Sequence, residues 1–526
     1  MNKRTITITA MLLIVGVGLV FYSLFLPTNQ VTETPTPKYG GVYKIPVRQE
    51  NSTLNPREMV WDQDKLVMFS IFDPLVRVAR SAEPIPALCH NWTLEKDSTV
   101  FNCTLRKNVS FHDGKKMTVK DVLFSINYIL GNGGLDIEDF DFIRGVKEFW
   151  EGKKNQISGV YAVNNDVVRF EFTKSVPSFA LLLASSRIVI LPEKLNGLSE
   201  KDFFNQPIGT GPFKFRKTDQ KLELPANWDY YNGRPYLDMV EFLPMSDDVA
   251  IASFEKGDVH NLVFYDTEQY LEQQERDSQQ VISKRASMLF LYPNNSETPF
   301  NNKTNRELLF SLIDKKQTIK DCGFESSYSD SVIPSVADGF IKKDLSGFYN
   351  LNRARKILDD KKQKNETLTP IDIYYVGYTL RKCIAEKANN NFKRLGVPWR
   401  MVETTYKDLG DLFFKGQIKV YMGSIPLDYA DAYSIFRYFV STNKENLTHI
   451  NDKALDLMIG ESRLIARPSD RAALYVTINE RIIDHAYVYP LCELKTVLVY
   501  DKKVNITEGS LENEYNIDLA KVWLDP

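Results

Sequence analysis

The most regular pattern of apolar and polar positions lies between residues 371 and 422. Three runs there are β-rich: "IDIYYV" at 371–376, "WRMV" at 399–402 and "IKVYMG" at 418–423. The first interval repeats apolar residues at helical spacing before a stop at Gly396: Ile384, Ala388, Phe392 and Leu395. The second interval, "YKDLGDLFFKG", is also helical in pattern. Alternating strands and helices predict right-handed βαβ units and a parallel sheet.

A second clear pattern is "FHDGKKMTVKDVLFSINYIL" at 111–130. Asp113-Gly114 is a tight-turn signal, and Thr118 precedes Asp121 by three residues, which is the spacing of a capping box. Apolar residues then recur at helical spacing before Gly131: Val119, Val122, Leu123, Ile126, Ile129 and Leu130. The pattern predicts a helix that begins after Thr118 and ends at Gly131.

Glycines mark two further turns into strands. "GGVYKIPV" at 40–47 is typical of a strand bounded by glycines. "PIGTGPFKF" at 207–215 contains G-T-G, a fragment of a phosphate-binding loop, but a proline and a strand follow it. A phosphate loop needs the free N–H groups of a helix at that point, so the glycines indicate a turn.

The first 28 residues have a different pattern from the rest. Lys3 and Arg4 precede an apolar run at 6–26, which matches the roughly 20 residues that cross a bilayer. No cysteine follows the run, and no small-x-small cleavage site is evident. We expect residues 1–28 to be a membrane anchor or an export signal, and residues 29–38, rich in proline and threonine, to be a linker. The body of the protein is then outside the cytoplasm.

Length, charge and cysteine content narrow the class of protein. A chain of 526 residues is too long for one core, which indicates two or three domains. The 66 basic and 68 acidic residues give a formal net charge of −2, so no basic field attracts nucleic acid. Five cysteines leave at least one thiol free. Cys89 and Cys103 flank a predicted hairpin, and the sequence leaves open whether they form a disulfide.

Candidate chemistry is sparse along the chain. The five histidines are at least 22 positions apart, so no H-x-x-x-H metal pair exists, and no G-x-S-x-G elbow, P-loop or C-x-x-C pair occurs. We therefore interpret His112 as part of a turn, and expect no catalytic residues, metal or cofactor. The best ligand edge is "SIPLDYADAY" at 424–433, beyond the carboxyl end of a predicted parallel strand. Its polar and aromatic residues, with one acid upstream, are Asp411, Asp428, Tyr429, Asp431 and Tyr433.

Several segments, taken in order, resemble the extracellular solute-binding proteins (family 5) that serve oligopeptide and dipeptide ABC importers. They are "TLNP", "FDPLVRVARSAEPIPALCHNWTLEKDSTVFNCTLRKNVSFHDGKKMTVKDVLFSINYI", "PSFALLL", "ILPEK", "PIGTGPFKF", "PFNNKTNRELLFSLIDKKQTI", "NLNRARKILDD" and "HINDKALDLMIGESRLIARPSDRAALYVTINERIIDHAYVYPL". The resemblance covers nearly the whole chain after the linker.

The resemblance implies an α/β, two-lobed periplasmic-binding-protein-like fold of type II, with three parts, a hinge and a ligand cleft between the lobes. Lobe I is expected to combine 39–70, 193–285 and 489–526. An inserted domain II would take 71–192, and an α/β lobe II would take 286–488. Hinge crossings are expected near 284–295 and 485–494.

The resemblance also implies ligand contacts at Asp428, Tyr429 and Asp431. In oligopeptide-binding members an aspartate in a D-Y-x-[DE] pattern holds the peptide's α-ammonium group, and Asp428-Tyr429-Ala430-Asp431 matches that pattern. A carboxylate there offsets the cost of burying the terminal charge. Ser424-Ile425 stands where the family has Gly-Trp, and Ala432 where it has proline, so this segment departs from that of a standard di- to pentapeptide receptor.

We therefore expect a monomeric receptor that captures peptides in the periplasm or at the cell surface and delivers them to ABC permease subunits. Residues 6–26 would tether it to the cytoplasmic membrane. The alternatives are a same-fold receptor for a metal chelate, haem or an oligosaccharide, and a signalling peptide receptor. A hydrolase that uses Asp411 and Asp428 is the rival from another class, and no nucleophile–base set supports it.

Overall fold

The chain separates into two units, Met1–Lys38 and Tyr39–Pro526. The computed structural model describes residues 36–47, 53–58, 62–79, 83–131, 140–185, 187–218, 221–264, 279–322, 327–340, 349–427, 431–443, 445–465, 467–506 and 517–525. Within these ranges no helix is long and apolar enough to cross a membrane. The apolar run at 6–26 lies outside them.

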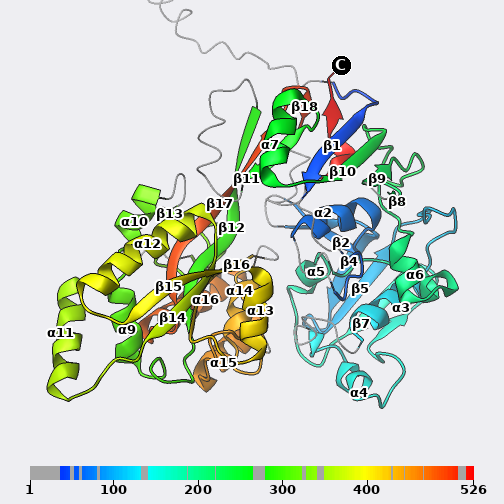
Figure 1. The fold of residues 1–526 in the computed structure, drawn as a ribbon. Coiled ribbons are helices and arrows are strands. Elements are labelled where there is room, and N and C mark those ends of the chain that lie inside the picture. The colour runs from blue at the N-terminus through cyan, green and yellow to red at the C-terminus, as the bar shows by residue number, and fades with distance from the viewer. Residues whose placement is uncertain are drawn as a thin grey trace, which may run out of the picture. The chain divides into compact units, whose positions relative to one another are not determined.

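A 7-stranded sheet organises the chain between residues 261 and 500 (Figure 1). Its strands, in order across the sheet, are β11 (Asn261–Phe264), β17 (Tyr489–Tyr500), β12 (Gln279–Pro293), β16 (Val420–Pro426), β14 (Ile371–Val376) and β15 (Trp399–Thr404), and β13 (Ser327–Tyr328) pairs with β17. β14 is parallel to both β15 and β16, which confirms the predicted parallel βαβ unit. β16 is antiparallel to β12.

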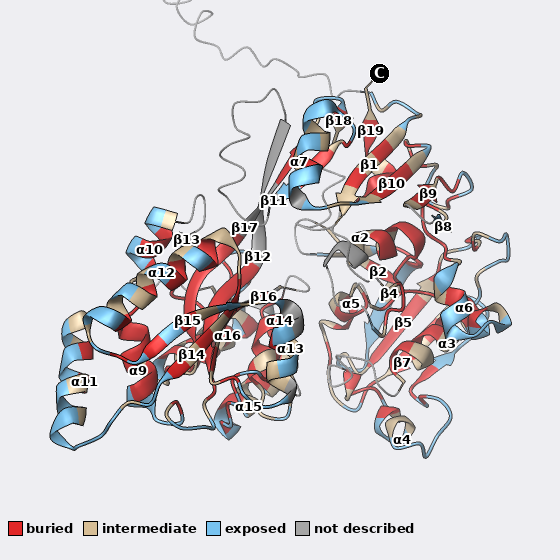
Figure 2. Ribbon diagram, in the orientation of Figure 1, coloured by how far each residue is buried: buried red, intermediate tan, exposed pale blue. Residues whose placement is uncertain are grey.

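Helices cover both faces of this sheet because its strands are apolar on both sides. Leu289 and Leu291 of β12 pack on one face, and Met288 and Phe290 pack on the other. The first face is covered by α9 (Lys303–Ser311), α10 (Lys315–Cys322), α11 (Leu351–Gln363) and α12 (Thr379–Arg394). The second face is covered by α14 (Tyr433–Phe436), α15 (Lys453–Ser462) and α16 (Pro468–Asp484). Figure 2 shows the described strands of this sheet as mostly buried and α11 as mostly exposed.

One long strand, β17, connects this sheet to a second hydrophobic core. Leu491 of β17 belongs to the core under α9–α12, whereas Leu498 of the same strand packs with Tyr43 and Ile45. β12 pairs with β17 alongside, and their register shifts between Ser283 and Ser287. The expected hinge segments fall on these two strands, and their role as a hinge stays a prediction.

The second core surrounds a 4-stranded sheet ordered β1 (Val42–Val47), β10 (Met239–Pro244), β9 (Leu222–Pro225) and β8 (Arg216–Lys217). A third core, formed by residues between Leu75 and Ile190, surrounds another 4-stranded sheet. That sheet is ordered β4 (Cys89–Glu95), β5 (Val100–Leu105), β7 (Val167–Glu171) and β6 (Val160–Ala162). The three-part division with its boundaries stays a prediction.

The helix predicted after Thr118 is α3, Val119–Ile129. Its capping box is complete: the Thr118 side chain accepts a hydrogen bond from the Asp121 backbone, and the Asp121 carboxylate accepts one from the Thr118 N–H at 2.7 Å. The Thr118 hydroxyl also accepts from the backbone N–H of Lys120. Asp121 also accepts from the Glu193 N–H at 2.8 Å, which fixes α3 to a distant segment. The sequence therefore predicted both the start and the end of this helix.

The two glycine-containing turns of the sequence meet in space. The Gly209 N–H donates to Nδ1 of His112 at 3.3 Å, and Nε2 of His112 lies 3.0 Å from the Gly211 carbonyl oxygen. A Cβ at Gly209 or Gly211 would overlap the Ile71 backbone, so only glycine fits there. His112 joins two turns, as its interpretation as part of a turn requires.

The structure contains two disulfides among its described residues. Cys89–Cys103 closes the predicted hairpin, with Cα atoms 5.4 Å apart on β4 and β5. Cys322–Cys383 joins α10 to α12 and was not anticipated from the sequence. Cys492 is the free thiol; it is fully buried, and burial raises its pKa to about 12.

Candidate ligand-binding site

The predicted ligand edge lies where the parallel strands β14 and β16 end. Ligands of such sheets bind beyond the carboxyl ends of the strands, because the loops there surround a crevice. The loop after β16 contains the predicted contacts Asp428 and Tyr429, and both lie outside the described residues. Asp411 is an exposed residue of α13 (Tyr406–Phe414).

Asp431, the third predicted contact, is buried at the start of the next helix, with 5% of its surface exposed. Its carboxylate accepts hydrogen bonds from the Tyr433 N–H at 2.9 Å and from the Tyr475 hydroxyl of α16. Nε of Arg471 lies 3.2 Å from the other oxygen. These partners fix the residue that follows the Asp428 loop to α16.

A residue that sequence reasoning did not select, Arg381, occupies the same edge. It is the third residue of α12, which follows β14, and only 5% of it is exposed. Its Nη2 donates to the hydroxyl of Ser424 on β16 at 3.2 Å. Ser424 belongs to the segment predicted from the sequence, so the structure places that segment beside a buried cation.

Arg381 has no carboxylate partner among the described residues, and its buried Nη1 makes no hydrogen bond there. A buried guanidinium without an acid is costly, because it has lost its hydration and gained no opposite charge. The first turn of a helix increases that cost, because the helix dipole is positive at this end. Arg381 is therefore a candidate contact for an anionic group.

Tyrosines surround the guanidinium. The Tyr378 ring lies 4.9 Å from Cζ of Arg381, and Tyr421 stacks on Tyr292 with ring centroids 6.0 Å apart. Burial raises the pKa of Tyr421, and the nearby charge of Arg381 opposes that rise. The hydroxyl of Tyr292 is buried and makes no hydrogen bond to a described residue. The surroundings of Arg381 are therefore aromatic, and they include a buried tyrosine hydroxyl with no described hydrogen-bond partner.

A sequence signal for Arg381 existed but is weak. The same rule that selected the loop after β16 also applies to the residues after β14, and a basic residue in a first helical turn is electrostatically unfavourable. The apolar spacing of this helix indicates only which of its faces packs in the core. Within the described part of the chain, no three His, Cys, Asp or Glu residues are placed to hold a metal ion.

Comparison with known proteins places this geometry in a family. The model of the bacterial extracellular solute-binding proteins, family 5 (middle region), matches residues 83–446. The periplasmic oligopeptide-binding protein OppA of Escherichia coli is 20% identical over 84% of this chain and 85% of its own. The dipeptide-binding protein DppE of Bacillus subtilis is 23% identical, over 83% of each chain.

Solved structures show the same fold. The murein tripeptide binding protein MppA of Escherichia coli has a TM-score of 0.81 at 18% identity, over 93% of this chain and 99% of its own. Haemophilus influenzae OppA in complex with the peptide RPPGFSPFR has a TM-score of 0.80 at 17% identity, over 93% of this chain and 100% of its own. The chain belongs to the family 5 bacterial extracellular solute-binding proteins, whose members are binding proteins, and it has their two-lobed α/β fold.

Proposed function

We propose that this protein is the extracytoplasmic receptor of an ABC importer and that it captures peptides between its lobes and delivers them to a membrane permease. The observation that carries the proposal is Arg381, a buried cation with no described acidic partner at the predicted ligand edge. Relatives named for oligopeptides and dipeptides support the ligand class. The protein acts by binding its ligand. It catalyses no reaction, and it needs neither a cofactor nor nucleic acid.

The peptide is held by both of its charged ends. Asp428 receives the α-ammonium group and Tyr429 lies against the peptide, while Asp431 completes the acidic pair and anchors the segment through Tyr475 and Arg471. Arg381 receives a carboxylate, either the carboxyl end of the peptide or an acidic side chain. Backbone hydrogen bonds along the extended peptide supply affinity with little side-chain preference.

The receptor works as a monomer held to the outer side of the cytoplasmic membrane. Residues 6–26 form the anchor and residues 29–38 the tether, which places the binding lobes in the periplasm or at the cell surface. The permease subunits of the importer are the protein partners. Fractionation of cells that produce the full chain tests this part: the protein would stay with membranes after a high-salt wash.

Matched ligand pairs test the two clamps. Mixed-sequence peptide pools with free ends, acetylated amino ends or amidated carboxyl ends are compared by melting temperature and by calorimetric Kd. Arg381→Gln should weaken binding of the free pool roughly 10- to 100-fold, because a hydrogen bond to a charged group contributes about 1.5–3 kcal/mol. The same variant should bind the amidated pool as the wild type does. Asp428→Asn should likewise weaken binding of the free pool, and it should bind the acetylated pool as the wild type does.

Two outcomes decide against the proposal. Equal binding of free, acetylated and amidated pools by the wild type contradicts both clamps.

A nickel-binding periplasmic protein of Escherichia coli is also 23% identical, over 86% of this chain and 89% of its own. Mass spectrometry of small molecules released from the purified, denatured protein therefore separates a peptide from a metal chelate, and recovery of a chelate overturns the peptide assignment.

A further inference from the structure

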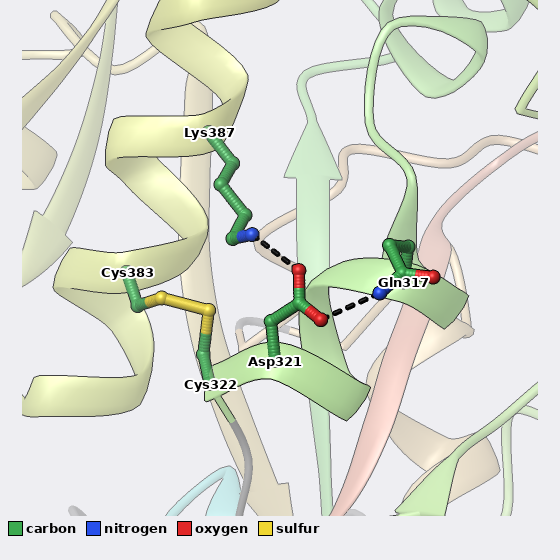
Figure 3. Close-up of a disulfide and its surroundings, with 5 residues drawn as sticks. All are labelled: Gln317, Asp321, Cys322, Cys383 and Lys387. Atoms are coloured by element: carbon green, nitrogen blue, oxygen red, sulfur yellow. Dashed lines mark hydrogen bonds and ion pairs between the residues drawn. A yellow bond between two sulfur atoms is a disulfide. The ribbon is translucent and has the colours of Figure 1, made fainter.

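The Cys322–Cys383 disulfide lies beside the candidate site, on the helix that carries Arg381. It joins the last residue of α10 to the second turn of α12, across a sequence separation of 61 residues and a Cα–Cα distance of 6.0 Å (Figure 3). An ion pair reinforces it: Nζ of Lys387 lies 2.6 Å from the carboxylate of Asp321, which also accepts a hydrogen bond from Gln317 at 2.5 Å. Two adjacent links therefore connect the same two helices.

The geometry of a helix places this connection opposite Arg381. Residues two apart differ by about 200° around a helix axis, so Cys383 and Arg381 face in nearly opposite directions. Cys383 and Lys387 are four residues apart and share the face toward α10. The face behind Arg381 is thus attached to α10, while Arg381 itself reaches Ser424.

The beginning and the end of α12 are held by different contacts. The N-cap residue Tyr378 provides no side-chain hydrogen bond to the first turn, where backbone N–H groups lack helical partners. Near the other end, Asn391 donates to the Leu312 carbonyl at 2.9 Å and Phe392 is buried in the core. The disulfide is therefore a covalent link close to the turn that carries Arg381, which has no side-chain N-cap.

α10 is itself fixed by buried polar contacts at its first residue. Lys315 at its first position is buried, and its Nζ donates to the carbonyl oxygens of Ser329 at 2.6 Å and Pro490 at 3.0 Å. The same ammonium lies 2.5 Å from the buried carboxylate of Asp330. Since Pro490 is part of β17, α10 is fixed to the central sheet, and the disulfide extends that fixation to α12.

We infer that the Cys322–Cys383 disulfide is a positioning element for ligand selection: it holds the first turns of α12 so that Arg381 stays aligned on the anionic group of the ligand. The inference rests on the proposed function, because it assigns the disulfide a role in the same site. Without the bond the charge of Arg381 remains, but the Arg381 side chain takes a wider range of orientations. Preference for a carboxylate then falls more than binding of an amidated ligand.

The test compares two disulfides within one chain. The Cys322→Ser/Cys383→Ser variant removes the bond beside the site, and the matched control, Cys89→Ser/Cys103→Ser, removes the hairpin bond on β4 and β5. The readout is the ratio of the Kd values for the amidated and free-carboxyl peptide pools. We expect the ratio of about 10 or more to be kept by the wild type and the control, and to fall to about 3 or less in Cys322→Ser/Cys383→Ser.

A second measurement uses the folded protein and requires no variant at Cys322 or Cys383. The control protein, Cys89→Ser/Cys103→Ser, retains only the Cys322–Cys383 bond. Dithiothreitol reduces that bond to two thiols, and the dithiothreitol is itself oxidised to its cyclic disulfide. Cys492 stays out of this exchange because it is fully buried. The ratio is measured before and after reduction, below the melting temperature, and it should fall after reduction.

The outcomes separate this inference from the proposed function. A wild type with no preference for free carboxyl ends contradicts the role of Arg381 itself, and with it the positioning role. A clear preference in the wild type that survives both loss and reduction of Cys322–Cys383 leaves Arg381 in place and overturns the positioning role alone. An equal fall in the hairpin control would also overturn it, because the effect would then be a general loss of stability.

Discussion

At the scale of single residues, His112 shows how a histidine beside an aspartate can join two turns of the fold. Its two ring nitrogens make hydrogen bonds with the backbone of Gly209 and Gly211, and these contacts are partly buried. Burial lowers the pKa of His112 to about 4, although its hydrogen bond to Gly211 acts in the opposite direction. The native state therefore holds a neutral imidazole at neutral pH.

This pKa predicts a defined pH dependence of stability. In the unfolded chain the histidine takes up a proton near pH 6.5, so between pH 6.5 and 4 the unfolded state binds more protons than the native state. The stabilisation is complete above pH 6.5 and is lost as the pH falls toward 4. The shift corresponds to about 3 kcal/mol. Urea unfolding midpoints measured from pH 4 to 7 should rise with pH, and His112→Gln should flatten that rise.

His90 supplies the matched control for this measurement. It is an exposed residue of β4, so His90→Gln is the same substitution at a site outside the buried contact between the two turns. Equal slopes for the wild type and His112→Gln would show that the histidine titrates alike in the folded and unfolded states.

Arg381 marks the limit of what single-residue patterns reveal. The rule for parallel sheets selected the segment that contains Ser424, and the structure places Arg381 beside that residue. The absence of a described acid beside Arg381, however, is a property of the three-dimensional surroundings of the residue. A sequence gives the identity of a charged residue but not the identity of its neighbours across a sheet edge.

At the scale of elements, local signals in the sequence were sufficient for α3 and for the βαβ unit. β14 has the bounds that its β-rich run indicated, and α3 begins directly after Thr118. These elements are specified by caps and periodicity within a few residues. The Cys322–Cys383 pairing could not be predicted from the sequence, because it depends on how α10 and α12 pack.

The cap of α3 gives an element-scale prediction. Thr118→Ala removes the hydroxyl that accepts from Lys120 and should destabilise the protein by about 1 kcal/mol, whereas Thr118→Ser keeps that acceptor and should cost only a fraction of this. Urea unfolding followed by circular dichroism measures both variants. Equal losses for alanine and serine would attribute the effect to the methyl group of Thr118 and not to its hydroxyl.

At the scale of the whole molecule, β12 and β17 are the strands that bear on ligand-induced movement. Both belong to the 7-stranded sheet, β17 contributes to two cores, and their pairing changes register between Ser283 and Ser287. A register irregularity of this kind bends and twists paired strands locally. We expect the strands to flex there when the lobes close over a peptide.

Closure predicts a change that solution scattering can detect. Addition of the free peptide pool to the full chain in detergent should lower the radius of gyration, and Arg381→Gln at the same ligand concentration should show a smaller decrease. A melting temperature measured on the same samples should rise, since free ligand at 100 times Kd adds about 2.7 kcal/mol of stability. A rise in melting temperature with an unchanged scattering profile would separate binding from closure and contradict the hinge assignment.

The pattern of the two disulfides has a consequence for biogenesis. Each bridge joins cysteines that are neighbours in the cysteine order of the chain, Cys89 with Cys103 and Cys322 with Cys383, and the odd thiol at 492 comes last. A polypeptide that meets an oxidant while it emerges from its amino end can pair each thiol with the next one to appear. Correct bridges then need no reshuffling, so secretion of this protein should depend on a disulfide-forming oxidant and hardly at all on an isomerase.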